Sequence, residues 1–317
     1  MLPYTVITTE GLEPVPMAWL KQQVHVIELS LKEPAGWDVA LATADGMIVR
    51  TYTQVNADLI RRAPKLKVVG RAGVGLENID LALCESAGIK VFSTPHANTN
   101  AVREYVFNLI FTLGRPIVRL REPIDADAFH AYRKSSRGLE LFGKTLGVLG
   151  MGRIGRAVSR TALAMGMEVI YNDVVDVSSE IDFAARSVLL EELLSRADIL
   201  TIHVSHRPGN RHFINAARLK RMKPSALLIN TARGEVIDAA ALAEAIKNGR
   251  LAGAALDVHD PEPPPPDYPL WRLDRVILAP HLAARTQGAM DAMSWVVRDV
   301  VEYLTTETPG AIQKGNL

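Results

Sequence analysis

Short apolar runs alternate with amphipathic stretches over the first 96 residues of the chain. Apolar side chains spaced three and four residues apart predict helices at 15–22, 56–63 and 80–87. Runs rich in β-forming residues predict strands at 4–8, 24–28, 47–50, 68–71 and 90–93. Because strands and helices alternate, we expect a parallel α/β sheet covered by helices.

The alternation resumes beyond residue 145 and predicts a second, larger sheet. Helices are expected at 189–196, 216–221 and 239–248, and Gly249 is suited to end the last of them. Strands are expected at 146–149, 168–171, 199–204, 226–230, 252–257 and 276–279, with one more near 187–188. Together these strands are enough for a complete doubly wound domain.

Two further helical patterns suggest how the halves are joined. Residues 97–120 predict a rigid crossing helix that Asn98 or Thr99 could cap, and the polar stretch 119–141 is expected to be an irregular surface segment. The last helix, 287–304, carries apolar side chains at helical spacing. We expect it to pack on the first domain, which makes that domain discontinuous and leaves a cleft between the two.

A glycine turn at the start of the second sheet indicates a ligand. Residues 145–173 have the order strand, glycine turn, helix, strand, acid. Gly150 permits the tight turn, Gly152 lets the backbone approach a pyrophosphate, and Gly155 lets the helix lie close on the strand. Asp173 is placed to bind an adenosine ribose and would repel a 2′-phosphate, so the pattern predicts NAD rather than NADP. The alternatives are a purely structural glycine turn and a strand-end turn at Asp173.

We therefore expect a substrate-binding (catalytic) domain at 1–97 and 288–317, and an NAD-binding Rossmann domain at 98–287. A length of 317 residues suits about two domains, and a net charge of +1 gives no field to attract nucleic acid or an anionic membrane. The single cysteine, Cys84, excludes an internal disulfide and a Cys-based metal site. No signal-peptide pattern and no stretch of about 18 apolar residues occurs, so we expect a cytoplasmic protein.

Three charged residues each follow a strand expected in the second domain: Arg233, Glu262 and His281. The carboxyl ends of parallel strands share one edge of a sheet, so these side chains can converge beside a nicotinamide. A histidine can move a proton, a carboxylate can orient it, and an arginine can hold a substrate carboxylate with two parallel bonds.

Simpler roles for the same residues stay open. Arg233 could be a surface residue at a helix start, Glu262 could be solvated in the stiff proline loop 261–266, and His281 could be an ordinary loop histidine. His96, which also follows a strand and a proline, is the rival proton carrier. His203 ends a strand and is expected to line the cofactor groove or the core.

Several motifs in order carry a family resemblance: VGRAGVGLENIDL, GKTLGVLGMGRIGR, LLINTARGEVID, GAALDVHDPEPPP and LAPHLAART. Over essentially its whole length the chain resembles the D-isomer-specific 2-hydroxyacid dehydrogenases. The resemblance implies two Rossmann-like or flavodoxin-like domains and an NAD-dependent oxidoreductase that interconverts a D-2-hydroxy acid and its 2-oxo acid. It also implies a homodimer formed through the nucleotide domains.

The resemblance also implies residue roles. Arg233 would bind the substrate carboxylate, Glu262 would pair with the histidine, and His281 would be the proton donor and acceptor. Backbone groups of Val74 and Gly75 would also meet the carboxylate. Cofactor contacts beyond the glycines and Asp173 are expected from Arg153, Ile154, Val204, Thr231, Ala232 and Asp257, the last of these at the nicotinamide amide.

Within the family the chain most resembles the D-3-phosphoglycerate dehydrogenases, through Arg50 in MIVRTYTQV and Arg71 in VVGRAGVG. These arginines would face a distal phosphate, unless both pair with nearby acids. The chain departs from the family at Ser205, where proline is frequent, and near Ala283 and Ala284, where glycine is usual. Because the chain ends soon after its last helix, no C-terminal regulatory domain is expected.

Other functions stay open beside this one. The alternatives within the fold are a hydroxypyruvate or glyoxylate reductase, another small 2-hydroxyacid dehydrogenase, a formate or phosphite dehydrogenase, and a non-catalytic NAD-sensing module. The intact set of arginine, glutamate and histidine argues against the last.

Overall fold

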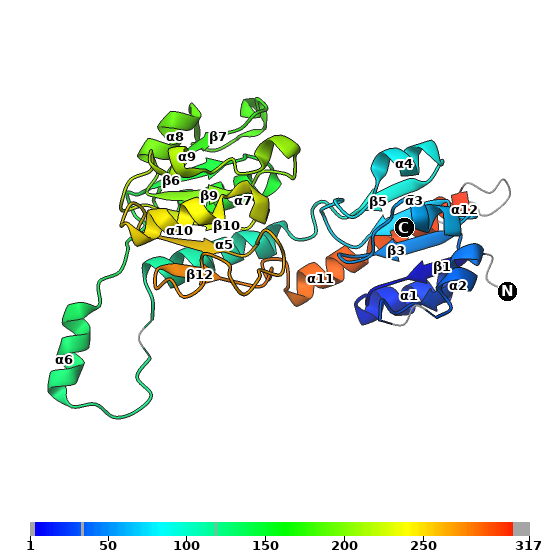
Figure 1. Ribbon diagram of the computed structural model, residues 1–317, viewed down its shortest axis with the longest axis horizontal. Helices are drawn as coiled ribbons and strands as arrows, with labels where there is room; N and C mark the ends of the chain where they lie inside the picture. The colour runs from blue at the N-terminus through cyan, green and yellow to red at the C-terminus, as the bar shows by residue number, and fades with distance from the viewer. Residues whose placement is uncertain (1–3, 33–34, 118, 307–317) are drawn as a thin grey trace. The chain divides into compact units, whose positions relative to one another are not determined.

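Figure 1 shows the computed structural model, which describes residues 4–32, 35–117 and 119–306. The chain forms two compact units: unit 1 comprises Met1–Asn98 and Arg285–Leu317, and unit 2 comprises Thr99–Ala284. The hydrophobic pattern placed the domain boundaries after residues 97 and 287, and the final part of the expected first domain, 307–317, lies outside the described residues. Within the described ranges we find no helix long and apolar enough to cross a bilayer, and no group of three or more metal-ligating side chains.

Unit 1 contains a five-stranded parallel sheet in the order β2-β1-β3-β4-β5. All five predicted strands are confirmed: β1 (Thr5–Thr8), β2 (His25–Glu28), β3 (Gly46–Val49), β4 (Val68–Arg71) and β5 (Lys90–Ser93). The strand order reverses between β1 and β3. At such a switch point, open α/β sheets bind ligands beyond the carboxyl ends of the strands.

The strands of unit 1 are connected by α1 (Pro14–Gln23), α2 (Trp37–Thr43), α3 (Ala57–Arg62) and α4 (Leu81–Ser86). The predictions of α1, α3 and α4 are confirmed, and the side chains of Asn56 and Asp80 cap α3 and α4. The sequence did not predict α2. Only Ala40 and Leu41 of this helix are buried, too few to produce a helical period.

The predicted last helix does return to the first sheet, but as two helices, α11 (Gln287–Ser294) and α12 (Val296–Thr306), which meet at Trp295. The valines of α12 share a core with Val6, Ile48 and Val68. Gly70 allows this packing, because a Cβ there would lie 2.6 Å from a methyl group of Val300.

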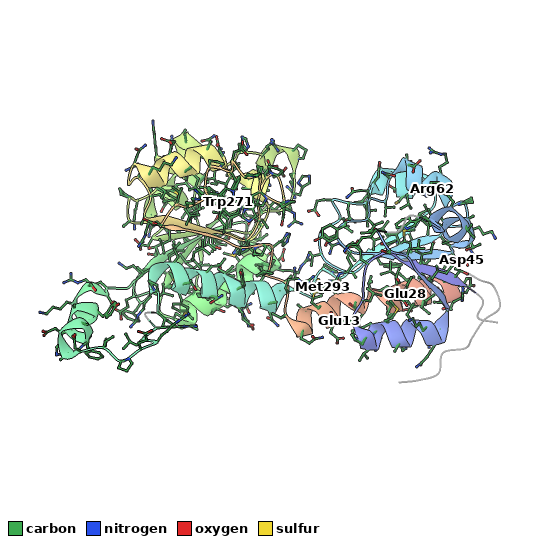
Figure 2. All side chains as sticks on the ribbon, turned by 60° about the horizontal axis from the view of Figure 1, so that its bottom comes forward. Glu13, Glu28, Asp45, Arg62, Trp271 and Met293 are labelled. Carbon is green, nitrogen blue, oxygen red and sulfur yellow. The ribbon has the colours of Figure 1, made fainter. Side chains whose placement is uncertain are left out.

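Glu13 joins α11 to the start of α1. Its backbone N–H donates to the Ser294 hydroxyl at 3.1 Å, and its carboxylate accepts from the Gln287 amide at 2.8 Å. Figure 2 shows Glu13 and Met293 where these two helices of unit 1 approach each other.

Unit 2 contains a seven-stranded parallel sheet in the order β12-β11-β10-β9-β6-β7-β8. The seven predicted strands are confirmed: β6 (Thr145–Leu149), β7 (Glu168–Asn172), β8 (Arg186–Ser187), β9 (Ile199–Ile202), β10 (Leu227–Asn230), β11 (Gly253–Leu256) and β12 (Val276–Leu278). Leu228 belongs to one core, whereas Leu227 and Ile229 belong to the other, so both faces of the sheet are covered. This is the doubly wound order, with its switch point between β6 and β9.

The helices of unit 2 are α5 (Thr99–Gly114), α6 (Ala126–Ser135), α7 (Arg153–Ala164), α8 (Leu190–Arg196), α9 (Ala216–Leu219) and α10 (Ala239–Lys247), with short 3₁₀ turns η1 (Ser178–Glu180), η2 (Pro208–Asn210) and η3 (Gly234–Val236). The helix expected at 97–120 is α5, which begins at Thr99 and ends at Gly114; residue 118 of that expectation lies outside the described residues. The irregular segment expected at 119–141 contains α6, which is a correction. Asp125 caps α6 by accepting from the Ala128 N–H at 2.7 Å, and no residue of the helix is buried. A helix without a buried face has no apolar period to reveal it.

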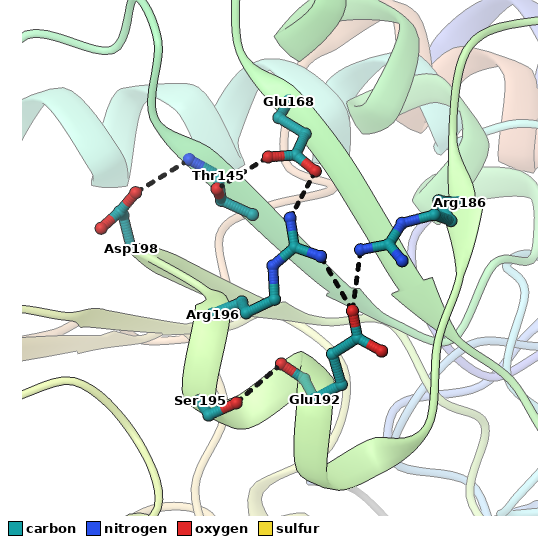
Figure 3. A network of polar contacts seen from close by, with 7 residues as sticks. All are labelled: Thr145, Glu168, Arg186, Glu192, Ser195, Arg196 and Asp198. Atoms are coloured by element: carbon teal, nitrogen blue, oxygen red, sulfur yellow. Dashed lines mark hydrogen bonds and ion pairs between the residues drawn. The ribbon is translucent and has the colours of Figure 1, made fainter.

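A polar network stabilises the edge of the second sheet where β6 and β7 begin (Figure 3). Asp198 accepts from the Thr145 N–H at 2.9 Å and from Lys223 at 2.8 Å. Arg196 bridges Glu168 and Glu192 at 2.6 and 2.8 Å. These charges lie at the starts of the strands, so the opposite edge is left for ligands.

Candidate functional site

The glycine turn between β6 and α7 requires each of its glycines for a different reason. Gly150 has a φ of +93°, and a Cβ there would lie 2.7 Å from the carbonyl oxygen of His203 on the neighbouring strand. A Cβ on Gly155 would overlap the Gly150 carbonyl oxygen. Gly152 has open space, because an added Cβ would meet no atom of the other described residues within 4 Å. Two glycines therefore serve packing, and the third leaves room beside the backbone.

The start of α7 faces the same space. Gly152 is the N-cap residue, and in the described part of the chain no side-chain hydrogen bond caps the helix, so the first backbone N–H groups are left for another acceptor. Arg153 and Ile154 form its first turn, with Arg153 exposed. Such a terminus, with its positive dipole end, suits a phosphate group.

Asp173, directly after β7, lies against this turn. Its Oδ2 accepts from the Met151 N–H at 2.7 Å, and its Oδ1 accepts from the Val175 N–H at 3.0 Å. The structure thus brings the predicted ribose-binding acid to the glycine turn. A carboxylate held here opposes a second negative charge, such as a 2′-phosphate.

The ends of β9 and β10 contribute the next predicted residues. His203 bonds Thr201 through Nε2 at 2.9 Å. The residue as a whole is partly exposed, but burial of its side chain lowers the pKa of His203 to about 3, so the ring is neutral. Val204 packs on the core, and Ala232 is itself buried. The Thr231 hydroxyl is buried and has no hydrogen-bond partner among the described residues.

These features together test whether a dinucleotide fits. The Thr231 hydroxyl has no hydrogen-bond partner in the described chain, and no side-chain hydrogen bond there caps the first N–H groups of α7. At Gly152 the backbone borders open space that a ligand could occupy. All three lie at the carboxyl edge of the sheet in unit 2. The residues present therefore fit a ligand with a hydroxyl-bearing sugar and phosphates.

Glu262 and His281 form a pair. Nδ1 of His281 and Oε1 of Glu262 are 2.9 Å apart, and the two side chains are 46% and 40% exposed in that order. Since a carboxylate only accepts hydrogen bonds, Nδ1 carries the proton, and Nε2 presents its lone pair when the ring is neutral. This arrangement can take up and release a proton at Nε2.

Arg233 follows β10, the strand next to β11 in the sheet. Its guanidinium donates to the Ala232 carbonyl oxygen at 2.6 Å. The Asn230 side chain shapes this segment, since it accepts from the Ala232 N–H and donates to the Arg233 carbonyl oxygen at 3.0 and 2.9 Å. The three residues expected to converge thus follow three adjacent strands, and the structure joins two of them directly.

Asp257 holds the turn that carries His281. Its buried carboxylate accepts from the N–H groups of Leu282 and Ala283 at 2.7 and 2.8 Å, and its carbonyl oxygen accepts from the His281 N–H at 2.9 Å. Burial raises the pKa of Asp257, although the two N–H donors oppose this effect. His281 has a φ of +56°, a left-handed conformation that Asp257 helps to hold. The sequence had suggested only a nicotinamide contact for Asp257.

The predicted substrate residues of unit 1 lie at the carboxyl ends of β3 and β4: Arg50 follows β3, and Arg71 is the last residue of β4. The Arg50 guanidinium donates to the Gly11 carbonyl oxygen at 3.1 Å and contacts the Met290 sulfur at 3.0 Å. Burial lowers the pKa of Arg50, and nearby Arg285 adds to this effect. Arg71 turns back over the segment that leads to Val74 and Gly75, where it donates to the Ala72 carbonyl oxygen at 3.3 Å.

Sequence reasoning missed Glu10, which shapes the loop after β3. Its Oε1 accepts from the N–H groups of Arg50, Tyr52 and Thr53 at 3.0 to 3.2 Å, and its Oε2 accepts from that of Thr51 at 2.9 Å. The available signal was an acid two residues after β1, the strand beside β3 at the switch point. His96, the rival proton carrier, is exposed in a turn after β5.

Comparisons with known proteins place these features in context. Residues 107–283 match the family model for the NAD binding domain of D-isomer specific 2-hydroxyacid dehydrogenases. The chain is 40% identical over 262 residues to a D-3-phosphoglycerate dehydrogenase of Methanocaldococcus jannaschii, over 82% of this chain and 49% of that protein. It is 36% identical over 271 residues to a glyoxylate reductase of Korarchaeum cryptofilum, over 84% and 81% of the two.

A solved structure is similar over nearly the whole chain. The D-lactate dehydrogenase from Aquifex aeolicus, complexed with NAD and lactic acid, is 28% identical with a TM-score of 0.77, over 95% of this chain and 94% of that one. This chain spans about half the length of the phosphoglycerate dehydrogenases that it matches.

Proposed function

This chain belongs to the D-isomer-specific 2-hydroxyacid dehydrogenase family, and we propose that it catalyses the NAD-dependent interconversion of a D-2-hydroxy acid and its 2-oxo acid. The single observation that carries the proposal is the 2.9 Å bond between His281 and Glu262, at the carboxyl edge of a doubly wound sheet. Cofactor binding is assigned to unit 2, and recognition of the distal part of the substrate to unit 1.

In the direction of oxidation, His281 acts as the general base. Its Nε2 accepts the proton of the C2 hydroxyl group while the C2–O bond becomes a carbonyl and the C2 hydrogen leaves with its electron pair. NAD, when bound, supplies the acceptor for that hydride. Glu262 stabilises the imidazolium that results and keeps Nδ1 protonated, so Nε2 is the nitrogen that exchanges the proton with the substrate. In reduction, His281 returns the proton.

Arg233 orients the substrate. A guanidinium can hold a carboxylate through two parallel hydrogen bonds, and Arg233 follows the strand next to that of Glu262. The positive charge also polarises the adjacent carbonyl group of a 2-oxo acid, which favours its reduction.

The residues that would hold NAD are those that fit its parts. The turn from Gly150 to Gly155 and the start of α7, with Arg153 and Ile154, would hold the pyrophosphate. Asp173 would bind the ribose, and its charge favours NAD over NADP. Toward the nicotinamide the expected contacts come from residues at the ends of β9, β10 and β11: Val204, Thr231, Ala232 and Asp257.

We assign a substrate with an anionic distal group, such as 3-phosphoglycerate. Supporting this, the Arg50 guanidinium contacts a carbonyl oxygen and a sulfur, and among the described residues it forms no ion pair with a carboxylate. Arg71, with backbone groups at Val74 and Gly75, is the second candidate. A small substrate is the alternative, because the chain is also similar to a glyoxylate reductase.

We also propose a homodimer that works in the cytoplasm. Phe129 and Tyr132 of α6 are 44% and 48% exposed. Ile117 and Phe142, on either side of the segment 119–141 that contains α6, are 82% and 76% exposed. Large apolar side chains gathered on one exposed segment are typical of a surface covered by another chain. A single species at the monomer mass in light scattering would refute the dimer.

The experiment that tests the function is a panel of 2-oxo and 2-hydroxy acids with NADH or NAD, run on the wild type and on His281→Ala. We expect turnover of at least one 2-oxo acid, and a fall in kcat of about 10²- to 10⁴-fold in the variant with NADH affinity kept. NADH binding without any turnover would instead identify a non-catalytic NAD-sensing module. Wild-type turnover in His281→Ala would remove His281 from its role.

A further inference from the structure

We infer that His259 is a positioning residue for the proposed proton transfer, because it fastens the loop of Glu262 to the loop of His281. The inference rests on the proposed function. His259 is 6% exposed and lies three residues before Glu262, whereas the side chains of Glu262 and His281 are 40% and 46% exposed. Since packing around the reacting pair is open, its geometry depends on what holds the two backbones.

His259 ties the two loops through one buried hydrogen bond, in addition to the bonds that Asp257 makes to the turn of His281. Nε2 of His259 lies 2.8 Å from the carbonyl oxygen of Ala279, two residues before His281. Since a carbonyl oxygen only accepts, Nε2 carries the ring proton and Nδ1 holds the lone pair. Nδ1 is buried without a hydrogen-bond partner in the described part of the chain. The ring therefore has one polar anchor, and that anchor is on the loop of His281.

The surroundings of His259 strengthen this bond. The Tyr268 ring stands edge-on to the imidazole, with centroids 5.7 Å apart and planes at 88°. Tyr268 is itself buried. Three residues later, the ring N–H of Trp271, which is labelled in Figure 2, donates to the Pro265 carbonyl oxygen at 2.8 Å. Away from water a hydrogen bond is stronger, and leaving the Ala279 oxygen unpaired is costlier.

The backbone of His259 also supports the loop of Arg233. A Cβ on Gly234 would overlap the carbonyl group of His259, so the two backbones are in direct contact. Gly234 directly follows Arg233. His259 thus contacts the loop of Arg233 and the loop of His281, and it belongs to the loop of Glu262.

A positioning role and a merely structural role for His259 predict different effects of substitution. If the imidazole only filled space, a phenyl ring would replace it. If its donor sets the spacing of Glu262 and His281, loss of the donor should slow proton transfer while the glycine turn and Asp173, which follow β6 and β7, are unaffected. A misplacement of about 1 Å can reduce a rate about 100-fold.

We would therefore compare three substitutions at this site. His259→Phe keeps the ring and its edge contact with Tyr268 but has no donor. His259→Gln loses the ring but can place an amide N–H near the position of Nε2. His259→Asn carries an amide that reaches only to the position of Nδ1, so it cannot replace the bond. His25→Phe, at an exposed histidine of unit 1, is the matched control.

We expect kcat in His259→Phe and His259→Asn to fall about 10- to 100-fold, with the NADH Kd within about twofold of wild type. His259→Gln should regain most of the lost rate, and His25→Phe should not differ from wild type. Wild-type kcat in folded His259→Phe would overturn the inference. So would equal losses in the Gln and Asn variants, which remain decisive if the Phe variant does not fold.

A spectroscopic measurement separates this inference from the proposed function. In ¹⁵N-histidine-labelled protein, the His259 ring should show the Nε2–H tautomer with a slowly exchanging proton. The His281 ring signals should move in His259→Phe and stay in His25→Phe. If no 2-oxo acid is turned over but these signals behave as described, the proposed function fails and the coupling stands. An Nδ1–H tautomer, or unmoved His281 signals, would refute the coupling itself.

Discussion

Alanine substitutions at Gly150 and Gly152, in the same turn, are expected to damage different properties of the protein. At Gly150 φ is +93°, and a Cβ would lie 2.7 Å from the His203 carbonyl oxygen and 2.9 Å from the Val204 nitrogen. At Gly152 φ is −71°, and an added Cβ would meet none of the described atoms outside its chain neighbours within 4 Å. The first substitution should therefore damage the fold, and the second should damage only what binds beside it.

The magnitudes follow from these surroundings. A left-handed backbone costs a non-glycine residue about 1–2 kcal/mol, and a methyl group forced against a fixed backbone adds about 1–3 kcal/mol. Gly150→Ala should thus lower the free energy of unfolding by about 2–5 kcal/mol and Tm by roughly 5–20 °C. Gly152→Ala should cost about 1 kcal/mol or less, because glycine is the better N-cap residue.

The assay is a pair of measurements on each variant: Tm of the cofactor-free protein by calorimetry, and NADH Kd by fluorescence titration. The methyl group of Gly152→Ala would occupy the space assigned to the pyrophosphate, so we expect Kd to rise at least about tenfold, about 1.4 kcal/mol. Gly288→Ala, which also meets no atom within 4 Å, is the control and should change neither quantity adversely. Unchanged NADH affinity in Gly152→Ala, or equal losses of Tm in both variants, would refute this reading of the turn.

Three further outcomes are expected. Arg50→Ala should raise KM for substrates with a distal phosphate or sulfonate at least about tenfold and leave glyoxylate unaffected, because charge-assisted hydrogen bonds to an anion are strong; an equal effect on all substrates in the same panel would count against the assignment. Glu10→Ala removes the acceptor of four backbone N–H groups in the Arg50 loop. It should therefore lower Tm and also raise KM for the anionic substrates. A normal KM would show that this loop does not depend on Glu10. Burial alone would raise the pKa of Asp198, but hydrogen bonds from Lys223 and the Thr145 N–H outweigh it and hold that pKa below its usual value. The carboxylate therefore stabilises the fold above its unfolded pKa of about 3.9, and this stability is lost as pH falls through the lower folded pKa. The difference in urea midpoint between wild type and Asp198→Asn should thus shrink from pH 7 to pH 3, and a constant difference would contradict the linkage.

Most of the secondary structure could be read from the chain because each strand is short, apolar and followed by a helical pattern. The exceptions have physical causes. In α2 only two residues are buried, and in α6 none is, so neither helix leaves an apolar period in the sequence. The pattern 287–304 also continues past Trp295, where the structure ends one helix and begins another. Apolar spacing reports which face is buried and not where the backbone bends.

The candidate site divides in the same way. The residues proposed for the chemistry could be named from their positions after strands, since parallel strands bring their carboxyl ends to one edge. The supporting groups could not. These groups act through contacts between distant segments. Asp257 binds the turn of His281, His259 binds Ala279, and Glu10 accepts from the N–H groups after β3.

The amino-acid sequence by itself determined the two parallel sheets, the glycine turn and the acid that follows β7, because hydrophobic period, glycine spacing and strand ends are local properties of a chain. The tertiary structure alone decided which carbonyl oxygen meets which donor. The 2.9 Å pair of His281 and Glu262 and the 2.8 Å bond of His259 join residues about 20 positions apart, across strands whose spacing only the folded sheet sets. The proposed proton transfer would depend on those distances to a fraction of an ångström, and no local pattern contains them.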